Sequence, residues 1–111
     1  MDKKISARFL SRTEEMILLT IWRLGNDAYC VSILEEMVKR TGRTWTLSGI
    51  YIPLGRLEKV ELVESYFGDP LPERGGKRRR FYRITKAGFT ALKEIKTIEK
   101  AMWLGLPNVS R

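Results

Sequence analysis

Hydrophobic and polar positions along the chain repeat with the period of a helix in four segments and with the period of a strand in two. The first helical segment, from Ser11 to Gly25, opens with side chains that can cap a helix and ends at a glycine. Between these signals it is apolar on nearly every side, and such a helix needs cover all round. A small domain can hardly supply that cover, so the pattern predicts that a second subunit covers part of this helix.

The second helical segment is conventionally amphipathic. It is expected to start with Asp27 as its cap and to end at Gly42. Its charged side is expected to face solvent. Its predicted inward stripe consists of Val31, Leu34, Met37 and Val38.

The third helical segment has an unusual outward face. It starts near Thr46 or Ser48 and runs to about Val60. At about 100° per residue, its inward face consists of Leu47, Ile50, Leu54 and Leu57. The opposite face consists of Ser48, Ile52, Gly55, Arg56 and Lys59, with Tyr51 at the boundary. This face combines a hydroxyl, two cations, a glycine without a side chain and an isoleucine exposed to solvent. Such a combination suits contact with the groove of a polyanion better than contact with water.

Two strand-like runs, residues 62–67 and 78–85, follow the third helix and are joined by a segment rich in glycine, proline and arginine. Six arginines and lysines lie between Arg74 and Arg83. The last segment, from Thr85 to about Leu104, is helical again, and its apolar positions alternate in spacings of three and four. These positions are Gly88, Ala91, Ile95, Ile98 and Met102. The spacing is typical of a coiled-coil seam, and a seam on a terminal helix indicates a partner chain.

This order of elements predicts a mainly α fold with a small β-hairpin, arranged as a winged helix-turn-helix followed by a C-terminal dimerisation helix. The segment between the two strands is a hairpin tip and not a linker between domains. We therefore expect one compact unit, with residues 1–84 as the winged-helix domain and residues 85–111 as the dimerisation helix.

Composition narrows the function. The 111 residues have a formal net charge of +8, which indicates an anionic partner such as nucleic acid or a membrane surface. The chain has no histidine, and its single cysteine, Cys30, has no partner for a metal set or a thiolate pair. No apolar run at the N-terminus is long enough for a signal peptide or anchor. We expect a cytoplasmic protein that is not an enzyme, uses no cofactor or metal and does not bind a membrane.

The chain resembles the PadR-like family of bacterial transcriptional regulators over about residues 10 to 95. The segments that match in order and spacing are EMILLTIWRLGNDAYCVSILEEM, RTGRTWTLSGIYIPLGRLEKVELVES and PERGGKRRRFYRITKAG. The resemblance implies a DNA-binding winged helix and a homodimer in which the last helix contacts the partner's first helix. It also implies repression of a promoter and, for some members, a small aromatic effector. Glu61 departs from the family, which usually has glycine before Leu62, so the turn after the third helix is expected to differ in detail.

The resemblance assigns roles to the residues singled out above. The third helix would enter the major groove of double-stranded DNA, and the basic wing would contact the backbone or minor groove. The predicted DNA-binding residues are Ser48, Tyr51, Ile52, Arg56, Lys59, Arg74, Lys77, Arg78 and Arg80. The predicted dimer interface consists of Ile17, Ile21, Ala91, Ile95, Ile98 and Met102. Trp22 and Trp103 are the candidate walls of a pocket for a small aromatic ligand.

Two other classes of function remain open at this point. A winged helix can act as a protein-interaction module with non-specific nucleic-acid affinity, in which case the basic wing meets an acidic partner. A basic protein can also bind a membrane surface, but no segment combines a strong apolar face with a lysine-rich one and lacks a place in the core. An enzyme is the weakest reading, because no catalytic set is present.

Overall fold

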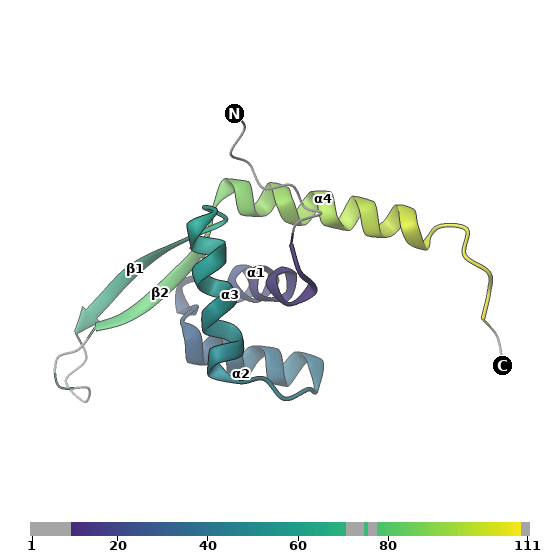
Figure 1. Ribbon diagram of the computed structural model, residues 1–111. Coiled ribbons are helices and arrows are strands. Elements are labelled where there is room, and N and C mark those ends of the chain that lie inside the picture. The colour runs from purple at the N-terminus through teal and green to yellow at the C-terminus, as the bar shows by residue number, and fades with distance from the viewer. Residues whose placement is uncertain (1–9, 71–74, 76–77, 110–111) are drawn as a thin grey trace.

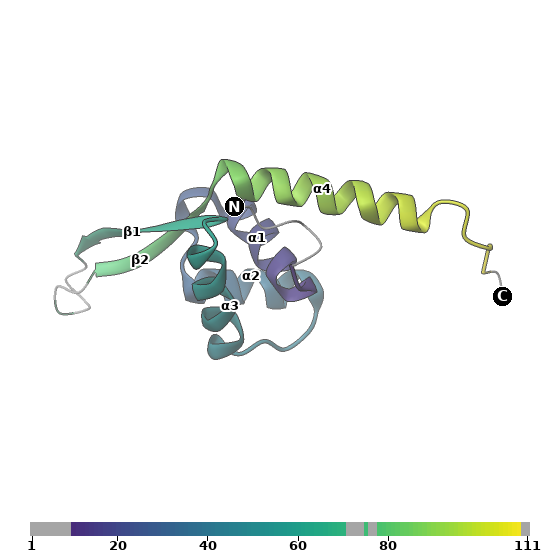
Figure 2. The ribbon, with the colours of Figure 1, turned by 45° about the horizontal axis from the view of Figure 1, so that its top comes forward.

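Three helices packed around an apolar core support a two-stranded wing and a long C-terminal helix (Figure 1). The computed structural model describes residues 10–70, 75 and 78–109. The elements are α1 (Arg12–Leu24), a short 3-10 helix η2 (Gly25–Asp27), α2 (Cys30–Thr41), α3 (Leu47–Lys59), β1 (Val63–Pro70), β2 (Arg78–Ile84) and α4 (Lys86–Trp103). The wing and α4 extend from the three-helix core in opposite directions, as Figure 2 shows from a second side. The predicted fold, mainly helical with one hairpin, is confirmed.

Local side-chain chemistry sets the starts of three helices. Ser11 caps α1: its hydroxyl accepts the Glu14 N–H at 3.0 Å, and the Glu14 carboxylate accepts the Ser11 N–H at 2.8 Å. The hydroxyls of Thr46 and Thr85 cap α3 and α4 by accepting backbone N–H groups, each at 3.0 Å. Because these bonds involve residues three positions apart, they were predictable from the sequence.

The second helix differs from its prediction in two ways. Asp27 is not its cap; the helix is capped at Tyr29, whose N–H donates to the Ser32 hydroxyl at 2.8 Å. Its buried residues are Ser32, Ile33 and Met37. Val31 and Val38, predicted to face inward, are exposed. The sequence offers two apolar stripes on this helix, and packing against α1 and α3 determines which one is buried.

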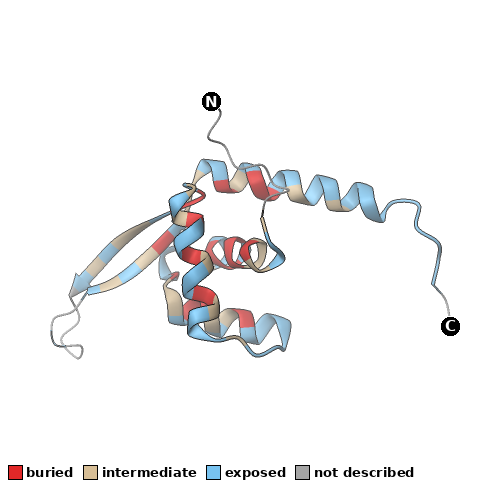
Figure 3. Cartoon of the chain, in the orientation of Figure 1, coloured by how far each residue is buried: buried red, intermediate tan, exposed pale blue. Residues whose placement is uncertain are grey.

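The core lies where α1, α2, α3, the base of the wing and the first turns of α4 meet (Figure 3). Its fully buried side chains include Ile17, Leu18, Ile21, Ile33, Met37, Ile50, Leu54, Leu57, Leu62 and Val63. The C-terminal half of α4 leaves this core and is mostly exposed. An apolar seam on that exposed half has no cover within the described chain.

The wing is an antiparallel pair in which Val63 lies opposite Ile84 and Tyr66 lies opposite Phe81. Tyr82 donates its backbone N–H to the carbonyl of Ala28 at 2.8 Å, so the segment before α2 is tied to the wing. The Tyr82 side chain is buried in the core. Because side chains alternate along a strand, this burial fixes which residues of β2 face α3 and which face away.

The turn from α3 into the wing places Glu61 in the left-handed region, with φ 65°. The Glu61 N–H bonds to the Glu58 carbonyl at 3.0 Å, and the Leu62 N–H bonds to the Leu57 carbonyl at 2.9 Å. These two bonds form a Schellman motif, whose left-handed position usually holds glycine. The turn keeps the geometry that glycine favours, and Glu61 adopts it at a cost in conformational energy.

Glu61→Gly is expected to raise the free energy of unfolding by about 0.5 to 1 kcal/mol, because relief of the strained φ outweighs the greater freedom of glycine in the unfolded chain. Urea denaturation at a fixed protein concentration measures the change. Glu61→Ala is the matched control, since it removes the same carboxylate and keeps a Cβ at this φ. A gain of equal size from alanine would show that charge, and not backbone strain, is responsible.

Candidate nucleic-acid interface

The outward face of α3 is the largest set of predicted contact residues that the structure leaves accessible. Tyr51 is 60% exposed and Ile52 is 70% exposed, while Leu54 on the opposite face is fully buried. Ser48 and Lys59 are exposed on the same helix. A helix with this division can lay its outer face into a groove without disturbing the core.

Arg56 lies on this face but is tied to another helix. Its Nη1 donates to Glu14 Oε2 at 2.8 Å, and the Glu14 side chain is only 7% exposed. The other oxygen of the Glu14 carboxylate accepts the Ser11 N–H of the α1 cap. The sequence predicts that Arg56 contacts DNA; in the structure its guanidinium is paired with Glu14 and still reaches solvent.

Glu58 joins α3 to both strands of the wing. Its carboxylate accepts the Ser65 hydroxyl of β1 at 2.6 Å and Nη2 of Arg80 in β2 at 3.0 and 3.1 Å. Arg80, predicted to contact DNA, therefore points toward α3 and helps to set the angle between that helix and the wing. The sequence analysis missed Glu58, because its partners lie 7 and 22 residues away and no local pattern links them.

Arginines and aromatic rings alternate on the other face of the wing. The Arg79 guanidinium lies 4.1 Å from the centre of the Tyr29 ring, and Arg83 lies 4.3 Å from that of Tyr66. Phe81 packs between these two rings, edge-on to Tyr29 and stacked on Tyr66, with centroids 5.6 Å apart in each case. These cation–π and aromatic contacts stiffen the wing. They also pack the Arg79 guanidinium against a ring, away from solvent.

Near the tip of the wing, Arg78 is exposed and Gly75 has φ 65°. Arg74 and Lys77, both predicted to bind DNA, lie outside the described residues. Phe67 is exposed on β1, and the Arg80 guanidinium lies 5.8 Å from the centre of its ring.

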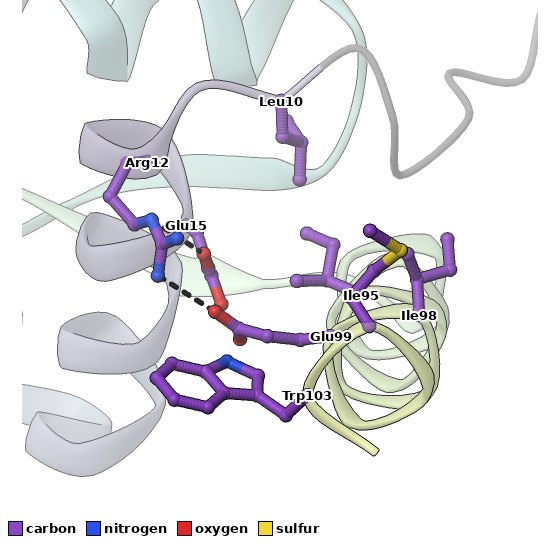
Figure 4. Close-up of a pocket in the computed structure, with 8 residues that line it drawn as sticks. Leu10, Arg12, Glu15, Ile95, Ile98, Glu99 and Trp103 are labelled. Carbon is purple, nitrogen blue, oxygen red and sulfur yellow. Dashed lines mark hydrogen bonds and ion pairs between the residues drawn. The ribbon is translucent and has the colours of Figure 1, made fainter. Parts of the chain in front are cut away.

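A groove lies between the N-terminal turn of α1 and the C-terminal half of α4, with a volume of about 370 Å³ (Figure 4). We call it the α1–α4 groove; it is lined by Leu10, Arg12, Glu15, Ile95, Ile98, Glu99, Met102 and Trp103. Trp103 is a wall of this groove, and its role in binding a small aromatic ligand stays a prediction. Trp22 does not line it, because its ring packs edge-on against Phe89 with centroids 4.7 Å apart.

One arginine faces two carboxylates in the α1–α4 groove. Arg12 Nη1 bonds to Glu99 Oε2 at 2.9 Å, and Arg12 Nε lies 4.0 Å from Glu15 Oε1. Burial raises the pKa of the Glu15 carboxyl above its ordinary value, the Glu99 carboxylate raises it further, and Arg12 lowers it. The groove therefore combines apolar walls with an excess of negative charge.

The predicted dimer-interface residues fall into two groups. Ile17, Ile21 and Ala91 are buried by their own chain, so they have no surface left for a partner and are core residues instead. The expectation that a second subunit covers part of α1 stays a prediction, and Leu19 and Trp22 are the large apolar residues of α1 that remain exposed. Ile98 is 51% exposed and Met102 is 71% exposed, while Ile95 is partly buried.

Glu14 is the second functional candidate that the sequence analysis missed, and here a signal was available. Ser11 and Glu14 stand three positions apart, which is the spacing of a capping box, and that motif places the glutamate beside the helix start. No sequence signal joins Glu14 to Arg56, which lies 42 residues further along the chain.

With this geometry established, comparison with known families is informative. The model of the transcriptional regulator PadR-like family matches residues 17–94. The chain belongs to the PadR-like family. It is therefore a transcriptional regulator and not an enzyme, which confirms both the resemblance and the exclusion of catalysis. No helix in the described part of this PadR-like chain is long and apolar enough to cross a bilayer.

Solved structures are similar in fold to this PadR-like chain, and one curated protein is similar in sequence. RosR of H. salinarum is 22% identical with a TM-score of 0.69, covering 92% of this chain and 84% of that one. A PadR family transcription regulator of Clostridium difficile is 25% identical with a TM-score of 0.62, covering 86% and 100%. An uncharacterized protein of Lysinibacillus sphaericus is 38% identical over 74 residues, and the match covers 65% of each protein.

Proposed function

We propose that this protein binds double-stranded DNA in the cytoplasm as a homodimer and represses transcription from a two-fold operator. The exposed outer face of α3, held beside a basic wing by Glu58, is the observation that supports the proposal. In this arrangement Ser48 and Tyr51 contact phosphates and Ile52 faces thymine methyl groups. Lys59 and Arg56 supply positive charge along the same groove.

The wing contributes mainly charge. Arg78 and the tip cations Arg74 and Lys77 neutralise phosphates or enter the minor groove, whereas Arg80 acts chiefly by holding the wing against α3. Such contacts depend on salt and carry little sequence information. Selection among operators therefore falls to α3.

The exposed apolar residues at the end of α4 support a homodimer. Ile98 and Met102 follow the seam spacing but have no cover within the described chain, and Leu19 and Trp22 are exposed on α1. Burying such residues against a second copy removes apolar surface from water. A two-fold dimer would present two copies of α3 to DNA, as dimeric helix-turn-helix proteins do.

The α1–α4 groove is the proposed site for a small aromatic effector. Trp103 offers a flat apolar wall, and the groove volume suits a molecule of a few rings. Within one chain Trp22 packs on Phe89 and does not line this groove. In this proposal it could form a wall of the effector site only if the Trp22 of a second copy lies beside the groove.

Selection of bound duplexes from a random pool by the purified protein tests the main proposal. The expected product is a motif repeated with two-fold symmetry. Absence of binding to any duplex at low salt would instead favour a protein-interaction module that uses the same basic surface.

Lys59→Ala is expected to weaken binding to the selected duplex by at least about five-fold and to lower the salt slope by about one per subunit, because one cation of the α3 face is lost. Fluorescence anisotropy at several salt concentrations measures both effects. Lys93→Ala is the matched control, since it removes the same charge from an exposed position on α4. Equal losses from the two substitutions would mean that α3 is not the contact helix and that only net charge matters.

A further inference from the structure

The first turn of α1, residues 11–15, contacts both α3 and the C-terminal half of α4. Arg12 and Glu15 face the α1–α4 groove, where Arg12 bonds to Glu99 of α4 at 2.9 Å. Glu14 bonds to Arg56 of α3 at 2.8 Å. Residues two positions apart on a helix point to nearly opposite sides, so a single turn can hold α4 with Arg12 and α3 with Glu14.

Both carboxylate oxygens of Glu14 accept a hydrogen bond. One carboxylate oxygen accepts the Ser11 N–H at 2.8 Å, and the other accepts Arg56 Nη1 at the same distance. The Ser11 hydroxyl accepts the Glu14 N–H in return, so the side chain is held by its own helix cap. Because the carboxylate is nearly buried, water screens its charge weakly, which strengthens its bond to the Arg56 guanidinium.

On the groove side, the contact of Arg12 is exposed and shared between two carboxylates. Arg12 is largely exposed and is shared between the Glu99 and Glu15 carboxylates, at 2.9 and 4.0 Å. Figure 4 shows Arg12 beside the carboxylates of Glu15 and Glu99, so loss of the Glu99 partner would leave Arg12 free to move toward Glu15 in its own turn. The turn is therefore held to α3 by a nearly buried ion pair and to α4 by an exposed one.

We infer that the first turn of α1 couples the Arg12–Glu99 pair in the α1–α4 groove to the DNA-contacting helix, with Glu14 as the positioning residue for Arg56. The inference rests on the proposed function, since it assigns Arg56 a place in operator recognition. It predicts that a change on α4 alters the choice of DNA sequence, although no residue of α4 that forms the pair touches α3. An event that breaks the Arg12–Glu99 pair would thereby regulate DNA binding.

The test compares Glu99→Gln with Glu94→Gln, two substitutions on α4 that remove one carboxylate each and change net charge equally. Glu94 is exposed and does not line the groove. Affinity of the full chain for its selected duplex and for a random duplex is measured by anisotropy, and the ratio of the two cancels the effect of net charge. We expect Glu99→Gln and Glu14→Gln to lower this ratio by about five-fold each. Glu94→Gln is expected to leave it unchanged.

A double-substitution cycle identifies the route. In an Arg56→Ala background, Glu99→Gln is expected to have no further effect on the ratio, because the residue that transmits the change is gone. A full effect in that background, an unchanged ratio in Glu99→Gln, or a higher ratio in Glu14→Gln would each overturn the inference. Thermal unfolding of every variant establishes that the ratio is compared among folded proteins.

A measurement without DNA separates failure of the inference from failure of the proposed function. In nitrogen-15 spectra, the Arg56 side-chain Nε–H signal is assigned by its loss in Arg56→Ala. Glu99→Gln is expected to shift this signal and Glu94→Gln to leave it in place. If the wild-type chain selects no duplex, the proposed function fails and the spectra still test the coupling. If the chain binds DNA but the two variants give identical spectra and ratios, only the coupling fails.

Discussion

Gly88→Ala is expected to lower the free energy of unfolding by about 3 kcal/mol, because the first turn of α4 has no room for a Cβ. A Cβ at this position would overlap the backbone carbonyl oxygen of Leu62 and would lie 2.6 Å from Cγ1 of Ile84. The Leu62 carbonyl cannot move away freely, since it accepts the Thr85 N–H at 3.0 Å. The clash therefore outweighs the helix propensity that alanine adds, which is about 1 kcal/mol.

Gly55→Ala is the matched control for this substitution. Gly55 also lies inside a helix, but a Cβ there would meet nothing within 4 Å. We expect it to raise the free energy of unfolding by up to about 1 kcal/mol through helix propensity alone. Both variants are compared by urea denaturation at one protein concentration, because the proposed dimerisation would add to apparent stability. Similar effects from both substitutions would contradict the close approach of α4 to Leu62.

Ile98→Asp is expected to convert the protein to a monomer at micromolar concentration and to weaken operator binding by at least about 100-fold. The substitution would bury a carboxylate without a partner in each half of a two-fold seam. Within one chain Ile98 is about half exposed, so the fold itself should tolerate the change. Sedimentation velocity measures the association state, and anisotropy with the selected duplex measures the affinity.

Thr97→Asp introduces the same charge at the preceding, exposed position of α4 and is expected to leave the proposed dimer intact. A small loss of DNA affinity shared by both variants would reflect net charge alone. A dimer that survives Ile98→Asp would exclude the end of α4 as the interface and leave its exposed isoleucine and methionine without a role.

The limits of sequence reasoning are clearest at the cations. Arg56 and Arg80 were both predicted to contact DNA, and the structure shows that each is also bonded to a glutamate of another element. Helical periodicity gives the side of a helix on which a residue lies, but it does not identify the residues of other elements that pack against that side. For Arg80, strand alternation separates neighbouring side chains onto opposite faces of the wing but does not identify which face turns toward α3. The burial of Tyr82 in the core decides it.

The sequence by itself determined the order of elements, most helix ends and the two faces of α3, because capping hydroxyls, terminal glycines and apolar periodicity act within a few residues. Leu47, predicted on the inward face of α3, is the exception and is exposed. Only the tertiary structure decided which stripe of α2 is buried, that Ile17 and Ile21 belong to the core, and that Trp22 packs on Phe89 instead of lining the groove. It also created the Glu14–Arg56 and Glu58–Arg80 pairs. Such contacts join residues far apart in the chain, and their existence depends on how whole elements pack, which no local pattern encodes.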